Sequence, residues 1–287
     1  MSISVNSNLL SLNVQNSYNK NVVGLQSSMD KLSSMQKINY AGDDPAGIGI
    51  SERLRTRIQS IDKANQNLQN DSAILKIADG ALSNMADIVS SIREKIVQAA
   101  DDSTTDDARV RLGKDIDNLI SRYDDVMKDA KYGSRAFFDK TDSTGIQKKN
   151  FAVQHGADAA DNFELTFSAL DAASLGIASS AVGSGVIKTG AVASDIKALI
   201  TTVDSALASI YNEQSTIGSY EQRLGYLSDN KTAEATALRE LESGIRDLDP
   251  AKGMTDFMKY NIRTQASQYM LAQAGQVPAM VLQLLQP

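Results

Sequence analysis

Residues 54–96 read LRTRIQSIDKANQNLQNDSAILKIADGALSNMADIVSSIREKI, with a large aliphatic side chain at every seventh position. These side chains belong to Leu54, Ile61, Leu68, Leu75, Leu82, Val89 and Ile96. A sustained seven-residue apolar repeat predicts a long helix that packs as a coiled coil. Immediately upstream, Asp44 suits the N-cap and Pro45 suits the first helical position, so we expect the helix to begin there.

The same helix carries a more polar companion seam, which reads Ile58, Asn65, Ser72, Asp79 and Ala86. A flanking apolar stripe, which comprises Ile74, Ala81 and Ile88 with Ile77, Met85 and Ile92, widens the apolar face. A face this wide indicates packing against more than one neighbour. Near its start, Gly47 and Gly49 weaken the first turn, which predicts an elbow at that point.

A second long helix is predicted downstream by the same repeat. Its seam runs from Ile196 through Val203, Ile210, Ile217, Leu224, Leu238 and Ile245, with one polar exception at Lys231. Asp249-Pro250 ends the pattern. Each helix spans about 50 residues, or roughly 80 Å at 1.5 Å per residue. Equal lengths predict that the two helices run side by side as a rod. A third helix is predicted between them by the apolar spacing from Leu112 to Ala130, and the acidic, polar run at 101–107 is the turn that reverses the chain and makes the rod antiparallel.

The segment 131–193 lacks the helical repeat of its neighbours. It has seven glycines and short stretches, such as 162–167, in which apolar and polar residues alternate. Alternation of this sort predicts one or two strands. The fold class expected for the whole chain is therefore mainly α: an antiparallel long-helix coiled-coil rod, a small β-containing cap and paired terminal helices. The predicted divisions are an N-terminal helix at 1–41, rod helices at 42–130 and 194–250, a cap at 131–193, and a C-terminal helix at 251–287.

The two ends of the chain are nearly uncharged. Residues 1–40 and 251–287 each hold four charged side chains, with a net charge of +2 at either end. The whole chain carries −6, so the segment between the ends carries −10. After Arg263, 24 residues follow without any charge.

Those ends keep helical apolar spacing despite their lack of charge. We predict that they form the inter-subunit assembly surface, through Val5, Leu9, Leu12, Val22, Leu25, Met29, Leu32, Met270, Ala274, Val277, Val281, Leu284 and Leu285. An amphipathic helix without a charged face is expected to be buried against other protein. Repeated head-to-tail contacts between copies of one chain produce open helical assemblies, so the pattern predicts a filament subunit.

Composition argues against several other functions. The chain has no Cys and a single His, which excludes thiolate metal sites and clusters of His ligands. An acidic balance disfavours nucleic-acid binding, and no stretch is apolar enough to insert into a membrane. The N-terminus lacks a cleaved secretory signal. We therefore expect no enzyme activity, cofactor or metal ion.

Several motifs resemble those of bacterial flagellins. The run Ile38-Asn39-Tyr40-Ala41-Gly42-Asp43-Asp44-Pro45-Ala46-Gly47 resembles the family signature after the N-terminal helix, with Asn39, Asp43, Asp44, Pro45 and Gly47 as elbow and signature residues. Segments 78–83, 91–100 and 265–285 resemble further flagellin motifs. The resemblance covers about 1–130 and 195–287.

This resemblance implies a subunit that is exported unfolded by the flagellar apparatus and polymerises into the extracellular filament that drives motility. Its implied partners are copies of itself, the export apparatus, a chaperone, and cap and junction proteins. Arg93 and Glu94 match a patch that the animal innate receptor for flagellin recognises, whereas Lys95 departs from it. The alternatives are a hook–filament junction protein, which resembles flagellin at both ends, and a cytosolic coiled-coil adaptor.

Overall fold

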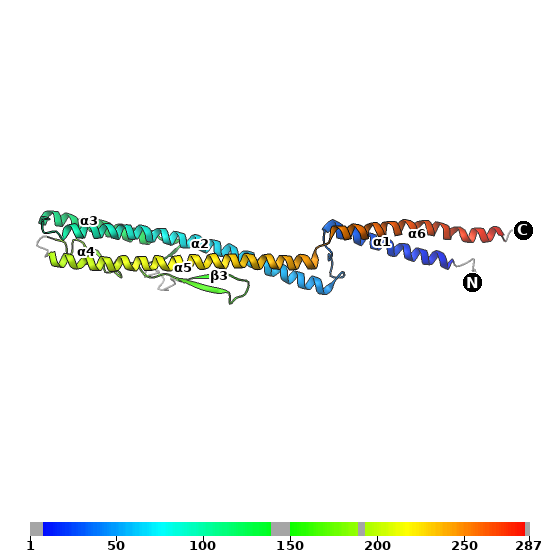
Figure 1. Ribbon diagram of the computed structural model, residues 1–287, viewed down its shortest axis with the longest axis horizontal. Coiled ribbons are helices and arrows are strands. Elements are labelled where there is room, and N and C mark those ends of the chain that lie inside the picture. Colours follow the sequence, from blue (N-terminus) through cyan, green and yellow to red (C-terminus); the bar gives the residue numbers. More distant parts are fainter. Residues whose placement is uncertain (1–7, 139–149, 189–192, 285–287) are drawn as a thin grey trace. The chain divides into compact units, whose positions relative to one another are not determined.

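The computed structural model describes residues 8–138, 150–188 and 193–284, with the side chains of 277–284 left out of that description (Figure 1). The chain divides into two compact units. The terminal unit comprises Met1–Ile58 and Thr236–Pro287, and the central unit comprises Gln59–Ala235.

The described structure is mainly helical, as the sequence predicted. Its two long helices are α2 (Pro45–Ala99) and α5 (Ala193–Arg246), with 55 and 54 residues, and each contributes to both units. The remaining helices are α1 (Leu9–Ser34), α3 (Asp106–Asp129), the short α4 (Ser179–Val182) and α6 (Pro250–Leu284). Among the described residues, no helix is both long and apolar enough to span a membrane.

In the central unit, α2 and α5 run antiparallel. Arg93 contacts Asp204 near one end of the pair, and Asn65 accepts a hydrogen bond from Ser228 near the other. The α2 seam from Ile61 to Ile96 is buried at every seventh position, and so are Val203, Ile210, Ile217 and Leu224 of α5.

Outside that stretch, the predicted seam residues Leu54, Leu238 and Ile245 lie in the terminal unit and are half-buried. The sequence repeat therefore continues through both units, while complete burial of its members is confined to the central one.

The second seam of α2 is one residue away from its predicted position. The buried series is Ala64, Ala78, Met85, Ile92 and Ala99, spaced three rather than four residues after the first seam. Of the predicted series, Ile58 and Ala86 are buried, whereas Asn65, Ser72 and Asp79 are only half-buried. Met85 and Ile92 were predicted as flanking residues, and the alanines hid the rest of the observed series, because alanine is as common on exposed helix faces as in seams. Asp71 occupies the same series and is also half-buried.

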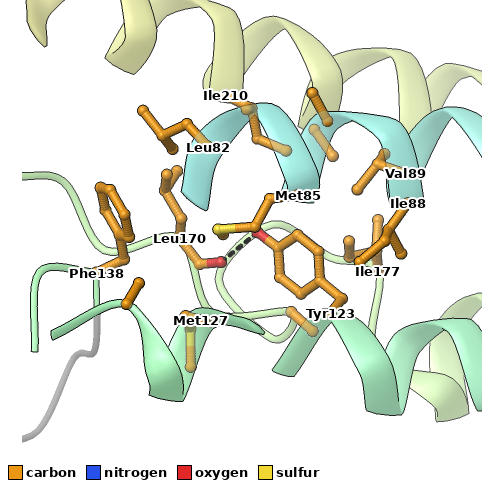
Figure 2. Close-up of a cluster of buried hydrophobic side chains, with 14 of the residues drawn as sticks. Leu82, Met85, Ile88, Val89, Tyr123, Met127, Phe138, Leu170, Ile177 and Ile210 are labelled. Carbon is orange, nitrogen blue, oxygen red and sulfur yellow. Dashed lines mark hydrogen bonds between the residues drawn. The ribbon is translucent and has the colours of Figure 1, made fainter. Parts of the chain in front are cut away.

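Helix α3 packs on α2 after a polar reversal. The Thr105 side chain accepts a hydrogen bond from the Ala108 N–H and caps α3, while the buried Arg109 Nε donates to the Ala99 carbonyl at 3.1 Å. Tyr123 of α3 is fully buried against α2 and donates its hydroxyl to the Leu170 carbonyl at 2.6 Å (Figure 2). Burial raises the pKa of this hydroxyl, which keeps it protonated as a donor.

Two antiparallel hairpins complete the central unit. The predicted alternation at 162–167 corresponds to β4 (Asn162–Thr166), which pairs with β3 (Asn150–Gln154). A shorter pair, β1 (Lys131–Tyr132) with β2 (Arg135–Ala136), turns at Gly133, whose φ of 63° favours glycine. The aromatic core beside them comprises Phe137, Phe138, Phe151, Phe163 and Phe167.

Asp71 makes the stability of the central unit sensitive to pH. Burial in the helix seam raises the pKa of its carboxyl from an ordinary value of 3.8 to about 6. The folded chain therefore holds this proton more tightly than the unfolded chain, and stability is lost as pH rises through the interval between these two values. We expect a loss of about 1 kcal/mol, after allowance for partial exposure to solvent.

The measurement is the urea midpoint of wild type and Asp71→Asn between pH 4 and 7. The difference between the two should change across this range, with Asp71→Asn gaining relative stability at higher pH. Asp87→Asn, at an exposed position on the same helix, serves as the control. A constant difference between wild type and Asp71→Asn would contradict the prediction.

Candidate functional site

The terminal helices α1 and α6 lie side by side and run antiparallel (Figure 1). The Asn8 side chain donates to the Ala274 carbonyl at 2.7 Å, and Asn21 donates to the Ser267 hydroxyl at 2.9 Å. At the other end of the pair, the Leu32 side chain approaches the α-carbon of Gly253. The contacts thus extend over most of the length of α1.

Small residues bring the two helices close together. A Cβ on Gly24 would stand 2.7 Å from Cδ1 of Tyr260, so this ring packs directly on the α1 backbone. Ser28, Thr264, Ser267 and Ala274 are buried. The hydroxyls of Ser28, Thr264 and Ser267 donate to carbonyls four residues earlier in their own helices. The interface between α1 and α6 therefore combines small residues, whose hydroxyls are hydrogen-bonded within their own helices, with larger side chains such as Tyr260 and Leu32.

Large apolar side chains of this pair lie on its outside instead. The exposed members described are Leu9, Leu10, Leu12, Val23, Met29, Met254, Met258, Ile262, Tyr269 and Met270. We call this set the outer apolar surface. Its members are all at least 45% exposed, so the contact between α1 and α6 leaves much of their surface in solvent.

The predicted assembly residues divide between the outer surface and the helix pair. Leu9, Leu12, Met29 and Met270 are exposed, while Val22, Leu25 and Leu32 are half-buried and Ala274 is buried. Val5 and Leu285 lie outside the described residues. Val277, Val281 and Leu284 belong to α6, but their side chains are not described. The sequence pattern did not separate contacts within the chain from exposed positions, because helical periodicity marks any apolar face.

The elbow lies between α1 and α2, before Pro45 rather than within the first turn of α2. Helix α1 ends at Met35 in the left-handed conformation, and the Asp43 carboxylate accepts hydrogen bonds from the backbone N–H groups of Tyr40 and Asn39. These backbone donors, aided by Lys31 at 3.5 Å, lower the pKa of Asp43. The carboxylate of Asp43 therefore stabilises the conformation of the loop between α1 and α2.

Asp44 and Gly47 start α2 together. Asp44 accepts from the Gly47 N–H at 2.9 Å, and Pro45 occupies the first helical position. A Cβ on Gly47 would stand 2.8 Å from Cδ1 of the buried Ile38. Gly47 is therefore required for close packing against the elbow loop, and the helix continues through it without a break.

Backbone pairing joins the elbow to the segment between α5 and α6. Gln36 and Asp247 form an antiparallel bridge, the Lys37 N–H donates to the Arg246 carbonyl at 2.7 Å, and the Leu248 N–H donates to the Met35 carbonyl at 3.0 Å. Asp249 then caps α6 by accepting from the Ala251 N–H.

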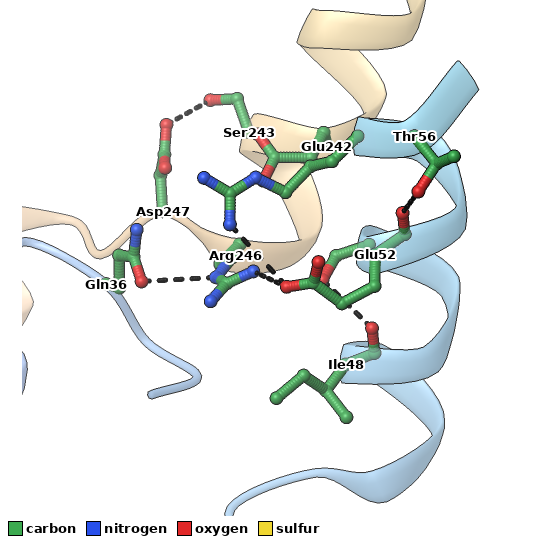
Figure 3. A network of polar contacts seen from close by, with 10 residues as sticks. Gln36, Ile48, Glu52, Thr56, Glu242, Ser243, Arg246 and Asp247 are labelled. Atoms are coloured by element: carbon green, nitrogen blue, oxygen red, sulfur yellow. Dashed lines mark hydrogen bonds and ion pairs between the residues drawn. The ribbon is translucent and has the colours of Figure 1, made fainter. Parts of the chain in front are cut away.

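The Arg246 side chain reinforces this junction (Figure 3). It is buried and donates to Glu52 Oε1 at 2.6 Å and to Gln36 Oε1 at 3.1 Å. The hydrogen bond from Arg246 lowers the pKa of Glu52. The sequence analysis did not identify this cluster, because Gln36, Glu52 and Arg246 share no motif and lie far apart in the chain.

Arg93 and Glu94 lie on an exposed face of α2 in the central unit. Arg93 Nε donates to Asp204 Oδ1 at 2.6 Å, and this carboxylate raises the pKa of the guanidinium. Lys95 pairs with Asp115 of α3 at 3.3 Å. Across the part of the chain that the structure describes, no three His, Cys, Asp or Glu side chains gather closely enough to hold a metal ion.

Comparisons with known proteins agree with the motifs at both ends. Residues 5–143 match the bacterial flagellin N-terminal helical region, and residues 200–285 match the bacterial flagellin C-terminal helical region. A flagellin of Bacillus subtilis is 34% identical over 302 aligned residues, covering 98% of this chain and 99% of the relative. A flagellar filament 31.3 kDa core protein of Treponema maltophilum is 29% identical, covering 97% and 100%.

A solved structure shares the fold. A putative flagellar hook-associated protein from Vibrio parahaemolyticus aligns with a TM-score of 0.56, over 71% of this chain and 100% of that one. Its sequence identity is 14%, so the likeness concerns the fold alone.

Substitution of Gly24 tests the close approach of α1 and α6. Gly24→Ala raises helix propensity by about 1 kcal/mol, yet its methyl group must displace the Tyr260 ring. We expect net loosening of the pair, seen as faster amide hydrogen exchange in residues 9–34. The matched control is Gly275→Ala, where a Cβ meets nothing within 4 Å and the helix should become slightly more stable. Equal protection in the two variants would contradict the close-packing interpretation.

Loss of the Arg246 side chain tests the junction. Arg246→Met leaves Glu52 and Gln36 without their shared donor and should destabilise the junction by about 1–3 kcal/mol. The readout is hydrogen exchange at the amides of Lys37 and Leu248, which both donate across the junction. Arg55→Met removes a more exposed cation at 3.5 Å from Glu52, so its effect should stay below about 1 kcal/mol. If both variants exchange alike, Arg246 does not hold the junction.

Proposed function

This chain belongs to the bacterial flagellin family, and we propose that it polymerises by burying the outer apolar surface of α1 and α6 against further copies of itself. The chain is a structural subunit of the flagellar filament. The proposal concerns how that subunit assembles, which residues do so, and where.

The outer apolar surface is the observation that carries the proposal. Burial of one large aliphatic side chain contributes about 1.5–3 kcal/mol, so several such side chains on two helices can supply a stable contact. Many of the surrounding residues are Ser, Asn, Gln and Thr, and none after Arg263 is charged. A contact through the part of α6 beyond Arg263 therefore requires no desolvation of charge on that segment.

The predicted assembly residues fit two roles in this arrangement. Leu9, Leu12, Met29 and Met270 contribute directly to contacts between subunits. Val22, Leu25, Leu32 and Ala274 hold α1 against α6 and so present the outer surface. We extend the assembly role to Val5, Val277, Val281, Leu284 and Leu285 from the sequence pattern alone.

The other predicted residues support the subunit rather than its contacts. Asn39, Asp43, Asp44, Pro45 and Gly47 fix the elbow, and the seam residues of α2 and α5 hold the central unit together. In domain terms, 1–41 and 251–287 form the assembly helices. Segments 42–130 and 194–250 carry the packed long helices, and 131–193 forms the small β-containing cap.

Membership of the family supports a proposal about export and location. We propose that the chain is exported unfolded through the flagellar apparatus without signal cleavage, with help from a chaperone, and joins an extracellular filament beneath a cap and beyond junction proteins. We also propose that it has no enzymatic activity. Arg93 and Glu94 are the residues of the innate-receptor patch that this chain shares with the family, and Asp204 orients the Arg93 side chain.

A hook–filament junction role is the second candidate. The structural likeness to a hook-associated protein favours it only at the level of fold, since the identity is 14%. The family matches at both ends of the chain and the similarity to filament proteins favour the filament. A cytosolic coiled-coil adaptor leaves the uncharged ends without a role.

Seeded polymerisation tests the assembly surface. Leu12→Glu and Ile262→Glu each place a charge on the outer apolar surface and should raise the critical concentration at least about tenfold, measured by sedimentation. Ala159→Glu, in the exposed turn between β3 and β4, adds the same charge elsewhere as the control.

A truncation provides the stronger version of this test. Deletion of 264–287 should abolish hollow filaments in negative-stain images while circular dichroism still reports a helical monomer. Filaments from the truncated chain, or equal effects of all three glutamates, would refute the proposed surface.

A further inference from the structure

Sulfur is distributed unevenly between the two units. Of the methionine side chains that the structure describes, Met85 and Met127 are buried in the central unit. The others all lie in the terminal unit and are 45–55% exposed: Met29, Met35, Met254, Met258 and Met270. The chain has no Cys and no Trp, so thioethers are its main targets for two-electron oxidants.

The position of Met35 is not explained by contacts within the chain. Its φ of 54° lies in the left-handed region, where glycine or asparagine is the usual residue and other side chains cost about 1 kcal/mol. The side chain nevertheless remains half exposed and gains little packing in return. Met35 also follows the end of α1, next to the backbone junction with Leu248.

Met29 and Met254 lie near one of the contacts between the two terminal helices. The Leu32 side chain, one turn after Met29, would contact a Cβ on Gly253, the residue before Met254. Met258 follows one turn later on α6 and is 55% exposed. Methionine is flexible and polarisable, so a surface of this composition adapts well to an apolar partner.

We propose that these five methionines form an oxidation site that controls whether the free subunit can assemble. The inference rests on the proposed function, because it requires the surface around them to be buried between subunits. The oxidant is hydrogen peroxide. The thioether sulfur attacks one peroxide oxygen, the O–O bond breaks, and the products are a sulfoxide and water.

A sulfoxide changes the character of the surface without changing the charge. It replaces a soft apolar atom with a strong hydrogen-bond acceptor, which loses its water when the surface is buried. Met85 and Met127 are shielded in the core, so mild oxidation leaves the central unit intact. Methionine sulfoxide reductases, one for each sulfoxide epimer, reverse the change with a dithiol as the reductant. The sulfoxide oxygen leaves as water and the dithiol becomes a disulfide, so the block on assembly is reversible.

The test compares peroxide-treated and untreated full-length protein in seeded polymerisation. Treatment is adjusted until peptide mass spectrometry shows sulfoxide at the five exposed methionines and none at Met85 or Met127. We expect the critical concentration of wild type to rise at least about tenfold, and the two reductases to restore it. Wild-type protein already in filaments should oxidise more slowly at the same five positions.

Two variants locate the effect, each compared with its own untreated sample. The first carries M29L, M35L, M254L, M258L and M270L, and should resist peroxide. The second carries M85L and M127L, and should remain as sensitive as wild type. If the first variant does not polymerise at all, oxidised wild type treated with the two reductases provides the test. Its polymerisation must then recover in step with reduction of the five sulfoxides.

Three results would overturn the inference while leaving the proposed function intact. The first is unchanged polymerisation of wild type after all five exposed methionines are oxidised. The second is equal sensitivity of the first variant and wild type to peroxide. The third is recovery of polymerisation that does not follow reduction of the five methionine sulfoxides. Failure of untreated wild type to polymerise would instead refute the proposed function, and this inference with it.

Discussion

The terminal unit depends on a backbone junction between two segments about 210 residues apart. Met35 and Lys37 exchange backbone hydrogen bonds with Leu248 and Arg246, so the ends of α1 and α5 cannot slide past one another. Since Asp44 and Asp249 cap the next helices within a few residues, the same junction sets where α2 and α6 begin. The register of α1 against α6 follows from this fixed starting point, and with it the outer apolar surface.

The two units differ in the kinds of side chain that they bury. In the central unit, large aliphatic and aromatic side chains fill a closed core, in which the buried Tyr123 hydroxyl donates to the Leu170 carbonyl. In the terminal unit, glycine, serine and threonine lie in the contact between α1 and α6 beside larger side chains such as Tyr260, while many large apolar side chains remain exposed. Small residues permit close approach with little loss of side-chain entropy, but they bury little apolar area. The helix pair is therefore suited to being completed by further contacts.

The seven-residue repeat was enough to predict the long helices, their antiparallel pairing and most of the first seam, because Leu, Ile and Val at this regular spacing are typical of helices that pack along a seam. It failed for the second seam, where Ala64 and Ala78 look like exposed helix residues and Asp71 breaks the pattern. It also could not find the junction, because Gln36, Glu52 and Arg246 meet only through the fold.

The Asp-Pro pairs predicted the helix boundaries well, since capping is local chemistry. The elbow was misplaced because glycine in a helix can serve close packing, as Gly47 does against Ile38.

Charge and exposure together explain the composition of the ends. A helix pair that stayed in water would ordinarily carry ions on its outer face, as α3 does with Asp107 and Arg111. Here the outer face carries Leu, Ile, Met and Tyr among uncharged polar residues, and its exposed charged exceptions are Lys20, Asp30, Lys252, Lys259 and Arg263. Burying an ion without a partner costs far more than burying Ser or Asn that can hydrogen-bond across a contact. The absence of charge after Arg263 is thus consistent with the proposed burial of this segment between subunits.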